Sequence, residues 1–320
     1  MSTHTIKEIR AEFKAQGKFH TPPELSRFLR GLIPGEPRDA YDPTCGAGAL
    51  LAEFDDATPK YGQDIDEAAL IDAQAVPNMH ISLGDVLTDP AFIERRFHAI
   101  VANPPFSIAW DPHVDERFEA MPCVPSKGRA DYVFIGHIIH MLADDGTAAV
   151  LAFPGILYRG AREGKIRQWM VEQNLVDQII QIPGDTFTDT AISTVALVLR
   201  KNRAVDEPVT FVDRELGLDR EVTRDEIRDN DFTLSVGRYV QATTAPQPPV
   251  DPDALQRDIV THLCHHVTNS LRTQRMVCDN FGGNYARIWR QVRDVVDRER
   301  PDTHLSPVDP MGTGNLLEEL

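Results

Sequence analysis

Four short runs in the first part of the chain place apolar or small residues before a polar end, and they cover residues 40–42, 61–64, 79–85 and 98–103. This pattern is typical of short strands in a parallel sheet. The polar ends are Asp42, Asp64, Asp85 and Asn103. Because the carboxyl ends of parallel strands meet at one edge of the sheet, we expect these four side chains to converge on one crevice.

Other segments have the apolar spacing of helices. That spacing predicts helices over residues 2–16, 22–32, 131–142 and 160–173. Apolar runs predict further strands at 146–153, 175–182 and 192–199, with a turn at 183–188 before the last of them. Thr21 and Asp66 are suited to cap the helices that follow them. His137 and His140, three residues apart on an apolar helix, are expected to be core or edge histidines.

The alternation of strands and helices predicts an α/β fold with a doubly wound, Rossmann-like sheet, mostly parallel with an antiparallel edge hairpin, plus a small C-terminal helical appendage. Residues 110–129, rich in proline, charge and single aromatics, predict a long loop that can contact substrate. The expected divisions are an N-terminal helix at 1–16, the α/β domain at 17–240, a linker at 241–252, a helical region at 253–299 and a disordered tail at 300–320. Within the helical region, two helices are expected, at 253–277 and 284–299.

Composition narrows the class of protein. Apolar content of 42% and charged content of 26% are ordinary for a soluble globular chain, and no apolar run is long enough to span a bilayer. The N-terminus has no signal-peptide core. Cysteines stand far apart, at Cys45, Cys123, Cys264 and Cys278, as is typical of free thiols. We therefore expect a cytoplasmic protein without a membrane segment.

The net charge of −16 bears on nucleic-acid binding, since a DNA-binding face must be locally basic. The best basic run is Arg159, Arg162, Lys165 and Arg167, although a solvated helix face explains most such runs. Histidines and a cysteine cluster at residues 262–266, but the spacing scatters them around one helix and no second ligand group follows. No metal site is expected.

The stretch Asn103-Pro104-Pro105-Phe106 is suited to chemistry on an exocyclic amine. The lone pair of an adenine amino group is conjugated into the ring. The side-chain oxygen of Asn103 and the carbonyl of Pro104 can each accept one N–H, which draws that lone pair towards an incoming methyl group. The prolines hold the backbone stiff, and Phe106 offers a face on which a base can stack. A buried strand that simply ends at two prolines is the alternative.

Residues 42–48, Asp-Pro-Thr-Cys-Gly-Ala-Gly, predict a strand end, a turn of small residues and the start of a helix. Glycines at such a turn let backbone N–H groups approach a ligand closely. Asp64 follows about twenty residues later, where doubly wound folds hold a ribose diol. The two features together favour a nucleotide-containing ligand.

The sequences at 42–48 and 103–106 together resemble those of S-adenosylmethionine-dependent N6-adenine DNA methyltransferases. Within that group, residues 17–240 look most like the modification subunit of type I restriction-modification systems. Other stretches agree, among them Gly17-Lys-Phe-His-Thr-Pro, Gly128-Arg-Ala-Asp-Tyr-Val-Phe and Leu157-Tyr-Arg-Gly-Ala-Arg-Glu.

This resemblance implies site residues. Phe19 and Thr21 would flank the methionine part of S-adenosylmethionine. The turn beneath it would contain Asp42, Thr44, Cys45, Gly46 and Gly48. Asp64 would bind the ribose hydroxyls and Asp85 the adenine amino group of the cofactor. Asn103 would lie beside the cofactor and, with Pro104, Pro105 and Phe106, hold the target adenine, whose other face Phe187 would cover.

The resemblance also implies DNA, a specificity subunit and a restriction subunit as partners. Relatives carry a helical domain before the Gly-Lys-Phe-His-Thr-Pro motif, whereas sixteen residues precede Gly17 here. The helices within 253–299 are expected to dock the specificity partner. Two rivals stay open: a protein glutamine N5-methyltransferase, whose site is nearly identical, and a non-catalytic subunit that has kept the fold.

Overall fold

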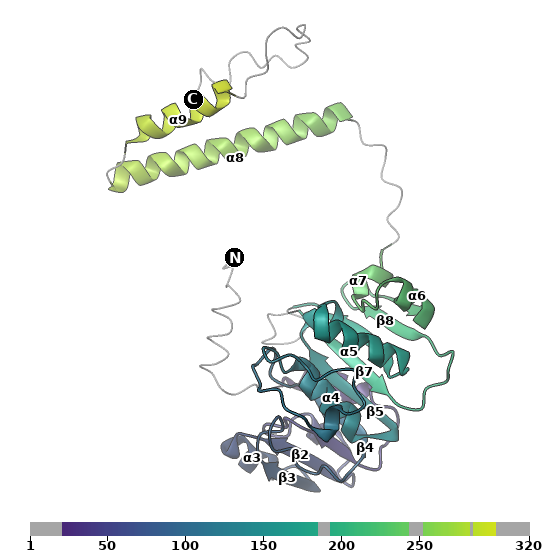
Figure 1. The fold of residues 1–320 in the computed structure, drawn as a ribbon. Helices are drawn as coiled ribbons and strands as arrows, with labels where there is room; N and C mark the ends of the chain where they lie inside the picture. Colours follow the sequence, from purple (N-terminus) through teal and green to yellow (C-terminus); the bar gives the residue numbers. More distant parts are fainter. Residues whose placement is uncertain (1–20, 185–192, 243–251, 282–283, 299–320) are drawn as a thin grey trace. The chain divides into compact units, whose positions relative to one another are not determined.

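The computed structural model describes residues 21–184, 193–242, 252–281 and 284–298. The chain divides into two compact units, residues 1–243 and 244–320. In the described residues, the first unit contains a mixed sheet with helices on both faces, and the second contains two helices (Figure 1).

Nine strands form one sheet in the described part of the first unit: β1 (Ala40–Asp42), β2 (Lys60–Asp64), β3 (Met79–Leu83), β4 (Phe97–Ala102), β5 (Leu142–Ala152), β6 (Val176–Ile182), β7 (Thr194–Arg200), β8 (Val209–Asp213) and β9 (Leu218–Val222). Their order across the sheet is β3-β2-β1-β4-β5-β7-β6-β8-β9. The strands from β3 to β5 are parallel, β7 is antiparallel to both neighbours, and β8 and β9 form an antiparallel hairpin at the edge. The predicted fold class is confirmed.

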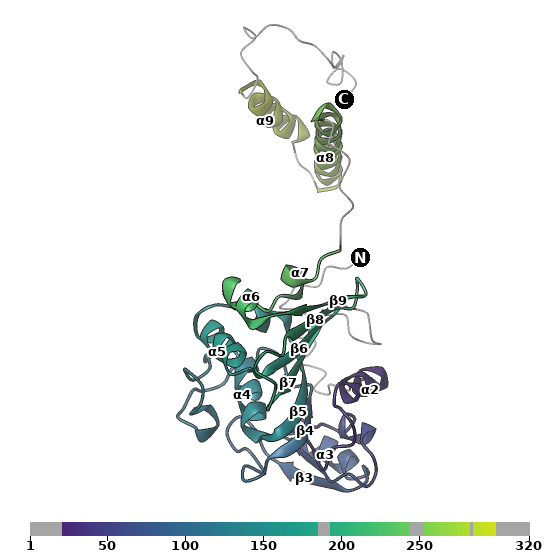
Figure 2. The ribbon, with the colours of Figure 1, turned by 90° about the vertical axis from the view of Figure 1, so that its right-hand side faces the viewer.

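Helices cover both faces of this sheet. The α-helices are α2 (Pro23–Gly31), α3 (Glu67–Ala73), α4 (Asp131–Met141), α5 (Ala161–Glu172), α6 (Arg224–Asp229) and α7 (Val236–Tyr239). Figure 2 shows α2 on one side of the sheet and α4, α5 and α6 on the other. Leu25 and Leu29 of α2 pack in the core of one face, whereas Phe134 of α4 and Ile166 of α5 pack in the core of the other.

The four residues from Ala99 to Ala102 of strand β4 are all apolar and all buried. Ile100 and Ala102 belong to the core cluster that includes α4 and α5, while Ala99 and Val101 belong to the cluster that includes α2. Successive side chains of a strand point to opposite faces, so a strand covered on both faces needs an apolar residue at every position. This strand delivers the chain to Asn103 at the carboxyl edge of the sheet.

Two side chains occupy the places predicted for them. The carboxylate of Asp66 caps α3 by accepting hydrogen bonds from the backbone N–H groups of Ala68 and Ala69. His137 is a core residue, with its Nε2 2.9 Å from the hydroxyl of Tyr41. Burial lowers the pKa of His137 well below its ordinary value, so its imidazole is neutral.

Two local predictions were wrong. The N-cap of α2 is Pro22, and no side chain caps this helix, because the helix starts directly at Pro23 and leaves Thr21 one residue too far upstream. After Gly48 the chain forms only a short 3-10 helix, η1 (Leu51–Glu53), before the extended backbone of Phe54. The residues that follow, Asp55-Asp56-Ala57-Thr58-Pro59, favour turns over helix.

The predicted loop at 110–129 is irregular apart from a short 3-10 helix, η2 (Glu116–Phe118), but it is packed more closely than expected. Trp110, Phe118 and Met121 are all buried in the core cluster that contains α4. Most of the loop's aromatic surface is therefore part of the core and not available to a substrate.

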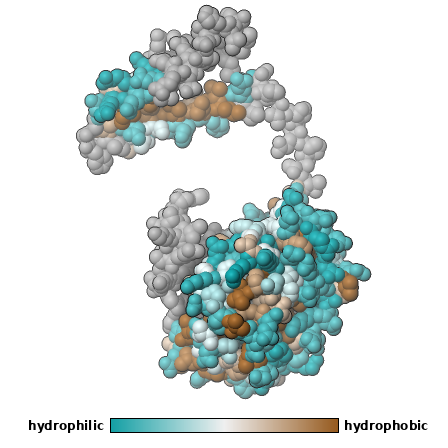
Figure 3. Space-filling view, viewed as in Figure 1, coloured by the Kyte–Doolittle hydropathy of each residue, from teal (hydrophilic) through white to brown (hydrophobic). Residues whose placement is uncertain are grey.

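The second unit contains α8 (Pro252–Phe281) and α9 (Tyr285–Arg298) in its described part. The first of them continues past the predicted end at residue 277. Exposed apolar side chains recur at helical spacing along α8, at Ile259, Leu263 and Val267, and Figure 3 shows an apolar stripe on this helix. Among the described helices of either unit, none has the length and apolarity needed to cross a membrane.

Candidate active site

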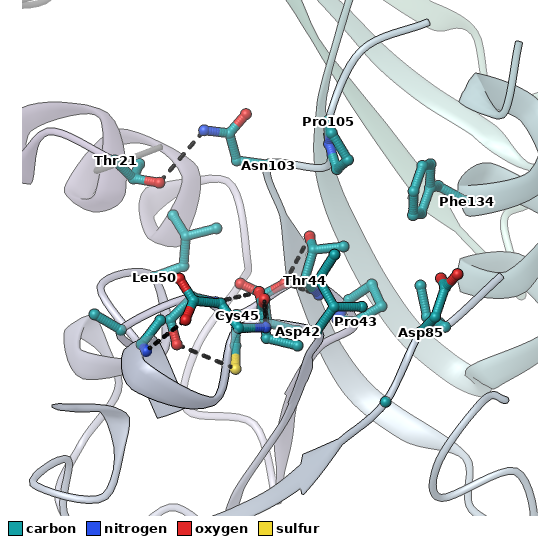
Figure 4. A pocket seen from close by; sticks show the side chains of 18 of the residues that line it. Thr21, Asp42, Pro43, Thr44, Cys45, Leu50, Asp85, Asn103, Pro105 and Phe134 are labelled. Atoms are coloured by element: carbon teal, nitrogen blue, oxygen red, sulfur yellow. Dashed lines mark hydrogen bonds between the residues drawn. The ribbon is translucent and has the colours of Figure 1, made fainter. Parts of the chain in front are cut away.

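A cavity of about 800 Å³ lies at the carboxyl ends of the parallel strands. Its lining includes Asp42 at the end of β1, Asp64 at the end of β2, Asp85 after β3 and Asn103 after β4. Figure 4 shows several of these side chains around the space. The predicted convergence of four strand ends on one crevice is thus what the fold produces.

The turn after β1 forms one wall of this cavity. Asp42 Oδ1 accepts a hydrogen bond of 2.9 Å from the backbone N–H of Thr44. The N–H of Gly46 donates to Asp64 Oδ2 at 2.7 Å. Gly46 and Gly48 have φ angles of +51° and +82°, a region that side chains disfavour, so glycine is needed at both positions. The other oxygen of Asp64 accepts from the N–H of Asp66 at 2.9 Å, so two backbone donors orient this carboxylate.

The cavity is strongly acidic. Six of its lining residues are Asp42, Asp64, Asp66, Glu67, Asp72 and Asp85, and no lysine or arginine occurs among the described residues that line it. Burial raises the pKa of Asp42 to about 8, helped by the nearby charge of Asp64 and opposed by the hydrogen bond from Thr44. The five other acids of the lining favour a cationic ligand and repel the phosphates of ordinary nucleotides.

Cys45 also lines the cavity, but it is not suited to nucleophilic chemistry. Burial raises the pKa of its thiol, and the charges of Asp42 and Asp64 raise it further. A protonated thiol is a weak nucleophile. Cys45 therefore serves here as a small packing residue of the turn.

Asn103 stands where β4 leaves the sheet. Its amide Nδ2 donates to the hydroxyl of Thr21 at 3.3 Å, and Figure 4 shows this bond. No described residue donates to Asn103 Oδ1, which leaves the amide oxygen free to accept. Thr21, predicted to cap a helix, instead orients the amide that carries this acceptor.

The rest of the tetrapeptide is held rigidly. Pro104 is buried, Pro105 lines the cavity, and Phe106 is half-buried against the core cluster that includes α2. The next residue, Ser107, has a φ of +53°, and its N–H donates to Asp131 Oδ1 at 3.2 Å. Asp131 is buried in the first turn of α4. An acid at the start of a predicted helix is the signal that could have identified it.

Arg117 does not line the cavity but supports two residues that do, and the sequence did not reveal this role. Its guanidinium is fully buried and donates to the carbonyl oxygens of Val86 at 2.6 Å and Leu87 at 3.0 Å. Those two residues directly follow Asp85. Burial alone would raise the pKa of Asp115, but its hydrogen bonds with Arg117 and the arginine's charge hold that pKa below its ordinary value. The ion pair thus fixes the segment that carries Asp85.

The structure describes only one of the three aromatic residues predicted for the site, Phe106. Phe19 and Phe187 lie outside the described residues. Phe134 of α4, which the sequence placed only in an apolar helix, lines the cavity and is labelled in Figure 4. Its ring adds an apolar wall opposite the acidic turn.

The predicted basic run needs a correction. Arg167 is buried, and its guanidinium donates to the backbone carbonyls of Phe232, Ile156 and Arg159, so it cannot contact DNA. Arg159 is mostly buried and pairs with two acids. Arg162 and Lys165 are exposed, so they are the members of the run that stay available.

The described residues contain no group of three or more histidine, cysteine, aspartate or glutamate side chains that could hold a metal ion. His265 and His266 of the C-terminal cluster are exposed on α8.

The sequence profile of the N-6 DNA methylase family matches residues 5–221. The methylase subunit of the type I restriction enzyme MpnII from Mycoplasma pneumoniae is 30% identical over 292 residues, which cover 72% of this chain and 54% of that protein. The MjaIX methylase subunit from Methanocaldococcus jannaschii is 25% identical over 299 residues, 73% of this chain and 53% of that protein. The chain spans about half the length of these relatives.

Among solved structures, the methyltransferase subunit of a type I restriction-modification system from Streptococcus thermophilus superimposes with a TM-score of 0.64 at 25% identity. The match covers 70% of this chain and 60% of that one. The family profile spans both the acidic cavity and the Asn103–Phe106 loop, and it covers more than half of the sequence. The chain therefore belongs to the N-6 DNA methylase family.

Proposed function

We propose that this chain transfers a methyl group from S-adenosylmethionine to the N6 amino group of an adenine flipped out of DNA, as the modification subunit of a restriction-modification system or a minimal relative of one. The observation that carries the proposal is the position of Asn103 and Pro105 on the wall of an acidic cavity. S-adenosylmethionine, when bound, supplies an electrophilic methyl group and is itself a cation, which suits that charge.

The cofactor fits the residues present. Asp64 would accept hydrogen bonds from the ribose hydroxyls of the cofactor, and Asp85 would accept one from the cofactor's adenine amino group. Thr21 and the turn from Asp42 to Gly48 would hold the methionine part. A volume of about 800 Å³ is ample for one such molecule.

The tetrapeptide Asn103–Phe106 would bind the amino group of the target adenine. Asn103 Oδ1, left without a described donor, would accept one N–H of the adenine amino group, and the Pro104 carbonyl would accept the other. Two acceptors localise the nitrogen lone pair and stabilise the positive charge that develops as the methyl group arrives. The exposed part of Phe106 would stack on the base.

Incubation with S-adenosylmethionine carrying a labelled methyl group tests the function. The expected result is label at N6 of adenine in DNA. If methyl transfer by the chain alone is slow, the reaction is run with the native partner. Label in protein glutamine would support the N5-methyltransferase reading, and no transfer to either with any partner would support a non-catalytic subunit.

Replacing Asp64 with alanine is expected to weaken S-adenosylmethionine binding by about 1.5–3 kcal/mol, because a hydrogen bond to a charged group is lost. Asp64→Asn keeps an acceptor for the N–H of Gly46, so its affinity for S-adenosylmethionine should fall less. Asp56→Ala removes an equal charge from an exposed position outside the cavity and should leave the affinity unchanged. Equal calorimetric affinities for Asp64→Ala and Asp56→Ala in folded protein would contradict the ribose assignment.

We further propose that the second unit docks a specificity subunit. With a net charge of −16 the chain repels DNA, and two of the four predicted basic contacts are engaged within the fold. A partner must therefore supply most of the affinity for DNA. The exposed apolar side chains Ile259, Leu263 and Val267 lie along one helix, α8, in a pattern suited to another helix.

Deleting residues 245–320 should leave S-adenosylmethionine binding intact and remove partner-dependent methylation, because the cavity lies wholly in the first unit. The measurements are calorimetry with the cofactor and label transfer to DNA with and without the partner. Efficient, sequence-specific methylation by the purified chain alone would overturn the docking role.

A further inference from the structure

A second cavity, of about 790 Å³, lies beside the same loop. The loop after β4 forms part of the wall of both cavities: Asn103, Pro105 and Ile108 line the first, and Ser107 lines the second. The two linings have no residue in common. The second cavity is therefore a separate space that adjoins the residues that would hold the target base.

The wall that contains Arg129 is fixed relative to this loop. The N–H of Ala130 donates to the carbonyl of Ile108 at 2.8 Å, and the N–H of Trp110 donates to the carbonyl of Lys127 at 3.1 Å. The indole of Trp110 also donates to the carbonyl of Ser126 at 2.9 Å. Arg129 therefore keeps its backbone position relative to the tetrapeptide.

Arg159, which lines the second cavity, is paired with two acids. Arg159 Nη1 lies 3.4 Å from carboxylate oxygens of both Asp131 and Glu163, and these acids are nearly inaccessible to solvent. A Cβ on Gly155 would lie 2.4 Å from the guanidinium of Arg159, so this position must be glycine for the arginine to lie there. The guanidinium of Arg159 is therefore occupied within the fold.

Two side chains that line the second cavity have no partner among the described residues. The guanidinium of Arg129 is exposed and has no hydrogen bond or ion pair with any residue that the structure describes. Tyr158 is 59% exposed, and its hydroxyl likewise has no partner in the described ranges. An unpaired arginine and an exposed aromatic ring that line one cavity can bind a nucleic-acid strand, the arginine through a phosphate and the ring by stacking on a base. The N-terminus of α5 also borders this space, and its first turn contains Glu163, whose carboxylate pairs with Arg159.

We propose that the second cavity binds the DNA strand that carries the target adenine, with Arg129 contacting a phosphate beside the flipped nucleotide and Tyr158 stacking on the adjoining base. This inference rests on the proposed function and names the residues that hold its substrate strand. It adds Arg129 to the exposed basic residues Arg162 and Lys165 of α5.

The test uses the full chain with S-adenosylhomocysteine and a fluorescent thymidine oligonucleotide that contains one central adenine. Low ionic strength keeps weak electrostatic binding measurable. Arg129→Gln should weaken binding about 5- to 10-fold, as expected for loss of a charged hydrogen bond. It should also reduce the slope of log K against log salt by about 0.7, the contribution of one phosphate contact in a single strand.

Lys127→Gln is the matched control. It removes the same charge two residues away, from a side chain that pairs with Asp111 and does not line the cavity. A second arm replaces single phosphates beside the adenine by methylphosphonate. One replacement should weaken binding to the unmodified protein and have no further effect on Arg129→Gln. Tyr158→Leu should lower affinity for the intact strand but not for one that lacks the adjoining base.

Equal effects of Arg129→Gln and Lys127→Gln, or additive effects of Arg129→Gln with every phosphonate, would overturn this inference. If the unmodified protein still methylates DNA in that case, the proposed function stands and only the strand assignment fails. If the unmodified protein binds cofactor but neither binds nor methylates DNA with any partner, both proposals fail together.

Discussion

Asn103→Ala is expected to reduce methyl transfer to adenine by about 100- to 1,000-fold or more, the usual effect of removing one group that stabilises charge in a transition state. The affinity for S-adenosylmethionine should change little, because acids at the other strand ends provide the contacts proposed for the cofactor. Single-turnover label transfer measures the first quantity and calorimetry the second.

Thr21→Val serves as a graded control for this prediction. It keeps the size of the side chain and removes the hydroxyl that accepts from Asn103 Nδ2 at 3.3 Å. The amide then loses its orienting partner but keeps its oxygen, so transfer should fall less than in Asn103→Ala. Equal loss of cofactor affinity and transfer in a well-folded Asn103→Ala protein would mean that Asn103 is structural.

The crevice could be predicted from sequence because each residue that forms it is recognised from its immediate neighbours in the chain. Each parallel strand ends on a polar residue, and the rule that such ends meet at one edge places Asp42, Asp64, Asp85 and Asn103 together without any knowledge of packing. Asp66 could likewise be read as a helix cap, because capping depends on residues within one turn.

The groups that support the crevice could not be predicted, since they act across long stretches of chain. Arg117 lies in a stretch that looks like a polar loop, yet it contacts carbonyls about thirty residues earlier in the sequence. Arg167 lies in a run that looks basic and solvated, yet it donates to Phe232, 65 residues later. A charged side chain carries no local sign of whether it is buried or exposed, because tertiary contacts decide that.

Arg117→Met is expected to lower the free energy of unfolding by about 3–5 kcal/mol, the usual cost of breaking a buried ion pair by removing one partner. The arginine side chain is fully buried, and its loss removes the guanidinium that pairs with Asp115 and donates to the carbonyls of Val86 and Leu87. Asp115 then keeps only the backbone N–H of residue 117 and His113 as partners among the described residues. Arg117→Lys keeps the charge but not the planar fork that reaches several acceptors at once, so it should recover only part of the loss.

Arg228→Met is the control, because Arg228 forms an exposed ion pair with Asp225 three residues earlier on the same helix. Surface pairs of this kind contribute about 0–1 kcal/mol, so urea unfolding should barely change. Similar midpoints for the two methionine variants would show that the buried pair does not stabilise the fold.

The stabilising role of Arg117 also predicts an effect on the cofactor. The guanidinium holds the two carbonyls directly after Asp85, so its loss should free the segment that positions this carboxylate. At a urea concentration and temperature where Arg117→Met remains folded, its affinity for S-adenosylmethionine should fall, whereas Arg228→Met should bind normally. The loss should be smaller for an analogue that carries a 6-oxo group in place of the purine amino group, because Asp85 has no N–H to accept from that position. A uniform loss for both ligands would mean that Arg117 stabilises the fold without positioning Asp85.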